Sequence, residues 1–394
     1  MAQFDAKIFN AEVFGKYLER IPRVKQNKLL EAGVLRPRNE LKAMLADQTG
    51  GNYITVPMLG LLDGEPLNYD GSTDLTATST KTYSQSMIVV GRAKGWTEKD
   101  FSADITGKNF MDNVAAQVAS YWDDVDQDTL LAILDGVFAM TGAGNKKFVD
   151  AHTSDLSGNS GEMGKVGATT LNTAIQKAAG ENKGIFKVVI CHSAVATNLE
   201  NLSAVSYLTY TDQSGMTRDL GMATWNGRTL LIDDSVPTKE GYYTAASGDA
   251  GALKIVADTS TPAAGEIKLA DVKAAAFYPS AAAAGDYVVM GTQYVSYILG
   301  DGAFDTCNCG AKVPSEMVRD AETDGGVDKL YTRQRKLFAP RGVSFTKASM
   351  ASLSPTPAEL RNGANWELVH DGNGSSKSYI NHKAIPIARI ISRG

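Results

Sequence analysis

The chain has 394 residues, of which 43% are hydrophobic and 21% charged, a balance that excludes a disordered chain and leaves room for roughly two or three cores. Its net charge of −5 argues against a basic domain that wraps nucleic acid. No apolar run approaches the roughly 20 residues that span a bilayer, and the first residues, "MAQFDAKIFNAEVFGKY", lack the pattern of a secretion signal. Because three cysteines give no disulfide framework, we expect a folded protein without membrane contact in the reducing interior of a cell.

An arm comes first along the chain. Apolar side chains recur at helical spacing between residues 4 and 18, Pro22 and Pro37 interrupt the pattern, and "RNELKAMLADQTGG" predicts a short helix closed by Gly50. The arm is rich in lysine and arginine. A solvated face is the simpler interpretation, and contact with a polyanion or a scaffold is the alternative. The basic residues concerned are Arg20, Arg23, Lys25, Lys28, Arg36 and Arg38.

A β-ribbon is expected next. Residues 52–59 and 82–94 are typical of strands, and they flank a middle rich in Gly, Asp, Ser and Thr. Two strands alone are marginal in water because they share too little apolar surface. We therefore expect the ribbon to pack against another copy of the chain.

A long helix is the clearest single element. Apolar residues step by three or four from Asn109 to Met140 without a proline, which predicts a helix roughly 45 Å long that ends at Gly142 and Gly144. Its aspartates, at positions 123, 124, 126 and 128, scatter around the helix, so they do not indicate an acid and base pair.

The middle of the chain mixes strands and helices. Residues 145–167 have the composition of a loop, a helix is expected over 168–184, and a buried strand at 188–191 leads into a helix that Ser193 would cap. Asn226-Gly227 is a strong hairpin signal.

The remainder of the chain returns to strands. The stretch 241–285 is rich in Ala and Gly and is expected to elaborate one end of a sheet. Strands, a short helix in "SPTPAELRNGANWELV" and a final strand in "KAIPIARIIS" follow.

No motif predicts catalysis. Cys307 and Cys309 have one residue between them and no second pair, which does not fit zinc. The histidines are scattered, Ser193 lacks the glycines of a nucleophile elbow, and Gly164-Lys165 lacks the rest of a phosphate-binding loop. We therefore expect no catalytic residue, no cofactor, no metal site and no small-molecule substrate.

Several stretches resemble those of one family. "NYITVPMLGLLDGEPLNYDGSTDLT" with "MIVVGRAKGWTEKDFS" is similar to an extended loop and its entry to a spine helix, "MATWNGRTLLIDDSVP" to an axial-domain hairpin, and "VPSEMVRDAETDGGVDKLYTRQRKLFAPRGVSF" to peripheral-domain strands. These stretches and their order resemble the major capsid protein of tailed bacteriophages, whose fold is named after phage Hong Kong ninety-seven and is shared by encapsulins.

This resemblance implies an α+β fold with five segments. They are an N-terminal arm over 1–49, an extended loop or β-ribbon over 50–100, a peripheral domain with the spine helix over 101–169, an axial domain over 170–302 with a small elaboration at 241–285, and the return strands of the peripheral domain with the C-terminus over 303–394.

The resemblance also implies a structural function. Copies of the chain would assemble through hexamers and pentamers into an icosahedral phage head that encloses double-stranded DNA. The extended loop would reach an adjacent subunit through Tyr53, Ile54, Val56, Met58, Met87, Ile88 and Val89.

Further partners follow from the same resemblance. No scaffold-like domain precedes the arm, so a separate scaffolding protein is expected, together with a portal and packaged DNA. The protein would lie in the virion capsid after assembly in the host bacterial cytoplasm. An encapsulin-type compartment is the nearest alternative, and an enzyme is the alternative from another class.

Overall fold

The computed structural model describes residues 33–47, 52–60, 66, 68–69, 81–100, 110–159, 161–203, 205–211, 217–372 and 377–393. These residues form two compact units. The first unit contains residues 36–139 and 304–377, and the second contains residues 33–35, 140–303 and 378–393, within the described ranges. Both units combine helices with sheets, as the α+β prediction requires.

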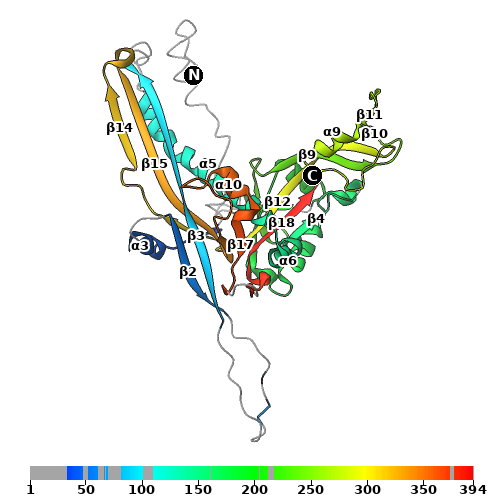
Figure 1. Cartoon of the computed structure of the whole chain (residues 1–394), viewed down its shortest axis with the longest axis horizontal. Coiled ribbons are helices and arrows are strands. Elements are labelled where there is room, and N and C mark those ends of the chain that lie inside the picture. The colour runs from blue at the N-terminus through cyan, green and yellow to red at the C-terminus, as the bar shows by residue number, and fades with distance from the viewer. Residues whose placement is uncertain are drawn as a thin grey trace. The chain divides into compact units, whose positions relative to one another are not determined.

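A six-stranded sheet forms the body of the first unit (Figure 1). Its path runs β1-β13-β15-β3-β2, and β14 pairs with β15. The strands are β1 (Leu35–Pro37), β13 (Phe304–Asn308), β15 (Val327–Pro340), β3 (Thr82–Lys99), β2 (Tyr53–Leu59) and β14 (Ser315–Asp320). The predicted ribbon is confirmed as the antiparallel pair of β2 and β3, in the register Tyr53↔Ile88 to Leu59↔Thr82.

The long helix α5 (Phe110–Phe138) packs along this sheet and confirms the predicted long helix. Trp122 Nε1 donates to Thr332 Oγ1 on β15 at 3.2 Å, and the ring of Tyr121 meets Trp96 on β3 edge-on at 5.4 Å. The C-terminal half of α5 is buried from Leu130 to Val137 apart from Asp135, which is half-buried. Protein therefore surrounds this half of the helix on nearly all sides, which is more burial than the single apolar stripe that the spacing predicted.

Smaller elements complete the first unit. Helix α3 (Glu40–Asp47) buries Leu41 on the sheet. The other elements are β16 (Val343–Phe345), paired with β17 (Trp366–Leu368), α10 (Pro357–Arg361), and the 3₁₀ turns η3 (Thr323–Gly325) and η4 (Gly363–Asn365). Thr356 caps α10 in a capping box with Glu359, whose carboxyl has its pKa lowered to about 2 by hydrogen bonds from Ser352 and from the backbone.

A ten-stranded sheet forms the second unit. Its path is β11-β10-β12-β5-β8-β7-β6, with β9 and β18 also on β12 and β4 on β18. The strands are β4 (Thr153–Asp155), β5 (Phe186–Cys191), β6 (Val205–Thr211), β7 (Thr217–Trp225), β8 (Arg228–Ile232), β9 (Thr238–Ala245), β10 (Ala252–Val256), β11 (Glu266–Lys268), β12 (Tyr287–Gly300) and β18 (Ile387–Ser392).

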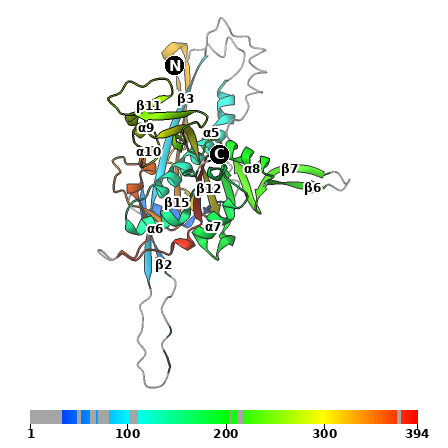
Figure 2. The same ribbon diagram turned by 90° about the vertical axis from the view of Figure 1, so that its right-hand side faces the viewer.

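Helices and short turns surround that sheet. They are α6 (Ala143–His152), α7 (Thr170–Ala179), α8 (Ser193–Asn201), α9 (Leu269–Ala274), η1 (Gly161–Gly164), η2 (Lys183–Ile185) and η5 (His382–Ala384). The core gathers Ile175 of α7, Phe186 of β5, Trp225 of β7, Ile298 of β12 and Ile390 of β18. Figure 2 shows β7 and β6 leaving the sheet as a hairpin beside α8.

Two local predictions are wrong. Residues 145–167 are not all loop, because α6 occupies 143–152; its two large buried side chains, Phe148 and His152, are too few to give a periodic apolar pattern. The N-cap of α8 is His192 and not Ser193. The strand β5 ends at Cys191, His192 keeps extended backbone angles, and its Nδ1 accepts the Ala194 N–H at 3.1 Å.

The stretch 241–285 lies at one end of the second sheet, as expected. Strands β9 and β10 both pair with the first half of β12, and α9 lies beside β10 and β11 (Figure 1). Val272 of α9 is buried in a small cluster with Ile255 and Val288.

The unit boundaries differ from the predicted domain boundaries at two places. Residues 140–169 and 378–393 belong to the second unit. The reason for the second difference is that β18 pairs with β12 from Leu299↔Ile387 to Tyr294↔Ser392, which fixes the C-terminus in that sheet. No described helix is both long and apolar enough to cross a membrane.

Candidate functional site

The base of the ribbon completes its packing within its own chain. Ile54, Met87 and Val89 are buried in one cluster with Leu41 of α3 and Leu337 of β15. Ile88 is buried as well. Residues distant in sequence cover Ile54, Met87 and Val89, and Ile88 is buried too, so within this chain these four side chains are not exposed for contact with an adjacent subunit.

The other three predicted contact residues, Tyr53, Val56 and Met58, are partly buried. The Tyr53 hydroxyl donates to the Phe345 carbonyl at 2.9 Å, and Lys347 Nζ lies 4.1 Å from the centre of its ring. Tyr53 thus serves the first unit, and Val56 packs at the edge of the same cluster.

Among the described residues of this region, two large apolar side chains that the sequence prediction omitted are exposed. Leu59, at the end of β2, is 87% exposed, and Tyr69 is 86% exposed. The exposure of Leu59 could have been predicted from its position in the sequence. It is the last residue of an alternating strand and precedes Gly60, so within β2 it lies furthest from the covered base. These side chains remain free to meet another molecule.

A second exposed apolar surface lies on the β14–β15 pair, which Figure 1 shows beside β3. Met317 is 56% exposed, and Val318, Tyr331 and Val313 are also exposed. Tyr331 lies over Gly95 of β3, where a Cβ atom would come within 2.8 Å of its ring. We call Val313, Met317, Val318 and Tyr331 together the β14 surface; Val318 and Tyr331 lie on one face of the strand pair and Met317 lies on the other. The predicted peripheral strands contained these residues, but nothing in their pattern indicated exposure.

Ion pairs join β3, β14 and β15 at one end of the same sheet. Arg319 lies 2.5 Å from Asp100 and 3.2 Å from Asp328, and Lys99 lies 2.7 Å from Asp324. Hydrogen bonds from Thr323 and then from Lys329 lower the pKa of Asp320 to about 2. Arg333 pairs with Glu316 at 3.1 Å beside the β14 surface. The charges of Arg319, Lys99 and Arg333 are paired within the chain, and the exposed side chains of the β14 surface offer apolar contact.

The structure describes part of the predicted basic patch. Arg36 is exposed, whereas Arg38 pairs with Glu40 and, at 3.1 Å, with Asp305. The charge of Arg38 is therefore used within the first unit and is not free for a polyanion. Arg20, Arg23, Lys25 and Lys28 lie outside the described residues.

The aspartates of α5 do not converge on a reaction centre. Asp126 is buried and accepts from Lys336 and, at 3.0 Å, from Gln334, both on β15. Burial raises the pKa of its carboxyl, and the two hydrogen bonds oppose that rise. Asp126 thus fastens the spine to the sheet.

Ser193, His192 and Asp234 lie near one another in the second unit. His192 Nδ1 already accepts from Ala194, the Ser193 hydroxyl is 3.5 Å from the same nitrogen, and Asp234 lies 3.6 Å from Nε2. This geometry is a helix cap, because the nitrogen that would take a proton from the serine is occupied. Among the described residues, no three potential ligands gather as a metal site would require.

Comparisons with known proteins agree on one class. No family model matches the chain. It is 25% identical over 342 residues to the major capsid protein of Bacillus phage SPP1, covering 86% of each chain.

Among solved structures, the chain is similar in fold to the capsid of cyanophage Pam1, with a TM-score of 0.52, 11% identity and coverage of 95% of this chain and 94% of that chain. It is also similar to the capsid of Ralstonia phage GP4, with a TM-score of 0.51, 9% identity and coverage of 92% and 87%.

These relatives are structural proteins of phage heads, so the compartment and enzyme alternatives are not favoured. The ribbon strands precede the long helix along the chain. The chain is therefore similar in sequence to a phage major capsid protein and similar in fold to phage capsids.

Proposed function

We propose that copies of this chain form hexameric and pentameric rings that close into an icosahedral head around double-stranded DNA. In this proposal the first unit is the peripheral domain with the ribbon and spine, and the second unit is the axial domain that faces the centre of each ring. Assembly would take place in the host bacterial cytoplasm.

The observation that carries the proposal is apolar surface that the described chain leaves uncovered. This uncovered surface has two parts, Leu59 with Tyr69 at the ribbon and the β14 surface. Burying on the order of 1,000 Å² of such surface yields a gross ~25 kcal/mol, from which association entropy and polar desolvation remove most. Each contact is then weak enough to reverse, and many contacts per copy make a closed shell lasting.

Head-to-tail contact is consistent with rings. The two surfaces differ from each other, and a contact between unlike surfaces repeats around an axis until the rotation closes. A self-complementary dimer would instead pair one surface with itself.

A separate scaffolding protein, a portal and packaged DNA remain part of the proposal. Arg36 is exposed and is the described member of the basic patch that remains available for an acidic scaffold or DNA. Because such contacts are electrostatic, they should weaken as salt is raised.

Light scattering and negative-stain electron microscopy of the purified chain, alone and with a co-expressed scaffolding protein, test the proposal. Shells of even size are expected. The variant Leu59→Ser and the double variant Met317→Ser with Val318→Ser should stay as small species. The matched control is Leu353→Ser, at a residue that is 92% exposed but lies on neither surface. A parent chain that stays small in both settings, or a control that fails like the variants, would contradict the proposal.

A further inference from the structure

Strand β3 changes its neighbours where the ribbon extends beyond the end of its pairing with β15. Strand β15 pairs with one edge of β3 from Lys99 to Val89 and no further. Beyond that point residues 82–88 still pair with β2 on the other edge. The edge that β15 has left meets side chains and carbonyls of residues 340–344 and 370. Single hydrogen bonds thus replace a strand ladder at the point of departure.

Gln85 makes the most deeply buried of these hydrogen bonds. Gln85 is only 2% exposed. Its Nε2 donates to the Pro340 carbonyl at 2.9 Å and to the Val343 carbonyl at 3.1 Å. The two carbonyls flank the turn between β15 and β16, in which Gly342 has a φ of 78°. Because both amide protons are used and the amide is planar, the direction of this side chain is fixed.

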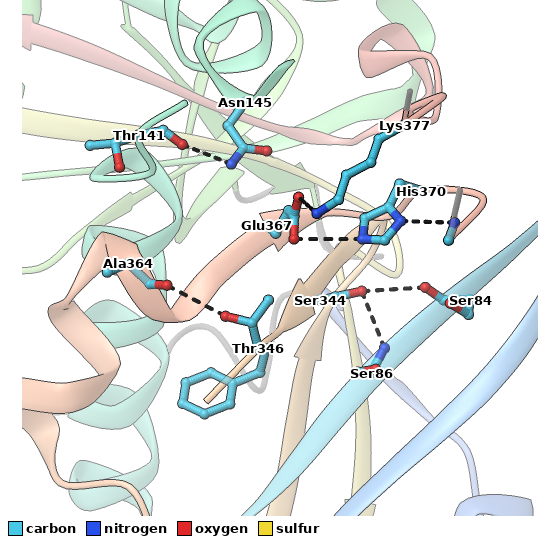
Figure 3. Close-up of polar contacts among 12 residues, drawn as sticks. Ser84, Ser86, Thr141, Asn145, Ser344, Thr346, Ala364, Glu367, His370 and Lys377 are labelled. Carbon is cyan, nitrogen blue, oxygen red and sulfur yellow. Dashed lines mark hydrogen bonds and ion pairs between the residues drawn. The ribbon is translucent and has the colours of Figure 1, made fainter. Parts of the chain in front are cut away.

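The residues on either side of Gln85 are held as well. The Ser86 N–H donates to Ser344 Oγ at 3.2 Å, and the Ser84 N–H donates to the His370 carbonyl at 3.3 Å. Figure 3 shows Ser344 facing both Ser84 and Ser86. Three consecutive residues of β3 are therefore tied to the first unit, and Gln85 is the central one.

A buried amide is an unexpected choice at this position. The neighbouring base of the ribbon is apolar, with Ile54 and Met87 in the same cluster, so an apolar side chain of similar size would also fill the space. Burying an amide costs desolvation free energy. When all of its hydrogen bonds are made, the amide allows only one arrangement of the surrounding backbone.

We propose that Gln85 is a positioning residue, which sets the angle between the ribbon and the rest of the first unit so that Leu59 meets the β14 surface of another copy. This inference rests on the proposed function. Leu59 lies three residues beyond Val56, the ladder partner of Gln85, or about 10 Å along an extended strand. A swing of roughly 20° moves its side chain by about 3 Å, which is enough to lose contacts that need about 4 Å between atoms.

The experiment distinguishes a change in the angle of the ribbon from a loss of folding stability. Gln85→Met keeps the size of the side chain and removes both donors. Leu337→Ala, in the same buried cluster, is the control that lowers stability, and Thr55→Val is the control that removes a ribbon hydrogen bond, to Ser86 at 3.0 Å, without touching Gln85. For each variant, the assembly threshold by light scattering and the free energy of unfolding in denaturant are measured without labels.

The angle is measured on unassembled subunits by electron spin resonance, as the distance between spin labels at Leu59→Cys and Glu322→Cys in a Cys309→Ser background. Both labelled positions are exposed and lie in the first unit. We expect Gln85→Met to broaden or shift this distance distribution and to raise the assembly threshold by about tenfold, whereas both controls keep the parental distribution.

An unchanged distribution in Gln85→Met would overturn the inference. So would a rise in threshold that follows the loss of stability in the same proportion as in Leu337→Ala. If the parent chain forms no shells, the proposed function fails, and the spin-label distances still decide whether Gln85 sets the angle.

Discussion

Lys336 of β15 reaches the carboxylate of Asp126, which α5 buries against the sheet. Gln334 donates to the second oxygen of the same carboxylate at 3.0 Å. The spine helix is therefore joined to the middle of the first sheet by a charge that has both of its oxygens satisfied. Pairs of this kind hold an orientation more than they add stability, because desolvation offsets their attraction.

Asp126→Ala should lower the free energy of unfolding by about 3 kcal/mol, because it leaves the Lys336 ammonium partly buried without its partner. The double variant Asp126→Ala with Lys336→Met should recover part of that loss. Denaturant unfolding of the single and double variants measures the coupling between them. Additive losses would show that the two side chains act independently.

Gly136 allows α10 to approach α5 closely. A Cβ atom there would lie 2.0 Å from the Leu360 carbonyl, which accepts from Trp366 Nε1 at 2.7 Å. Gly136→Ala should lower the free energy of unfolding by about 1–3 kcal/mol or more. The control is Gly184→Ala, where a Cβ would meet open space and the change should stay within about 0.5 kcal/mol. Equal losses in the two variants would contradict the packing argument.

Features that depend on nearby residues were predictable from the sequence. The apolar stripe of α5 and the Asn226-Gly227 turn both follow from spacing or from one dipeptide. The helix α6 was not predictable in this way, because its buried face carries only Asn145, Phe148 and His152.

The sequence alone did not show which apolar residues of the ribbon are covered by the rest of the chain. Ile54, Val56 and Met58 lie on the same face of β2, yet Ile54 is buried and Met58 is only partly buried. The difference comes from Leu337 and Ala339, which are far away in the sequence and cover the base of the ribbon alone. A period of two predicts which side chains share a face and not which of them will be covered.

The Asn226-Gly227 hairpin has positive φ at both turn residues, 49° and 75°, as a type I′ turn needs. Gly227→Val should therefore lower the free energy of unfolding by about 1–2 kcal/mol, since a β-branched residue is strained there. Gly227→Asn is the matched control and should change it less, because asparagine tolerates positive φ and a Cβ atom at this position meets open space. A Gly227→Val variant as stable as this control would show that the turn relaxes to another type.

His152 makes the second unit sensitive to acid. Its ring lies buried on α6, with Nδ1 2.7 Å from the Ile387 carbonyl and Nε2 3.2 Å from His382 Nδ1. Burial, more than the neighbouring His382, lowers the pKa of His152 from 6.5 to about 4. Because the short bond to Ile387 requires a proton on Nδ1, the neutral ring donates there and accepts from His382.

Between these two pKa values the unfolded chain binds a proton that the folded chain does not. The contribution of His152 to stability is therefore complete above pH 6.5 and falls as the pH drops toward about 4, by about 3 kcal/mol in all. Hydrogen exchange of the β18 amides across this range measures the fall. His152→Gln should be less stable at neutral pH and show a flatter pH dependence, whereas His370→Gln, in the first unit, should keep the parental slope. A slope that His152→Gln leaves unchanged would assign the acid sensitivity to other groups, because the buried imidazole is what resists the proton in this account.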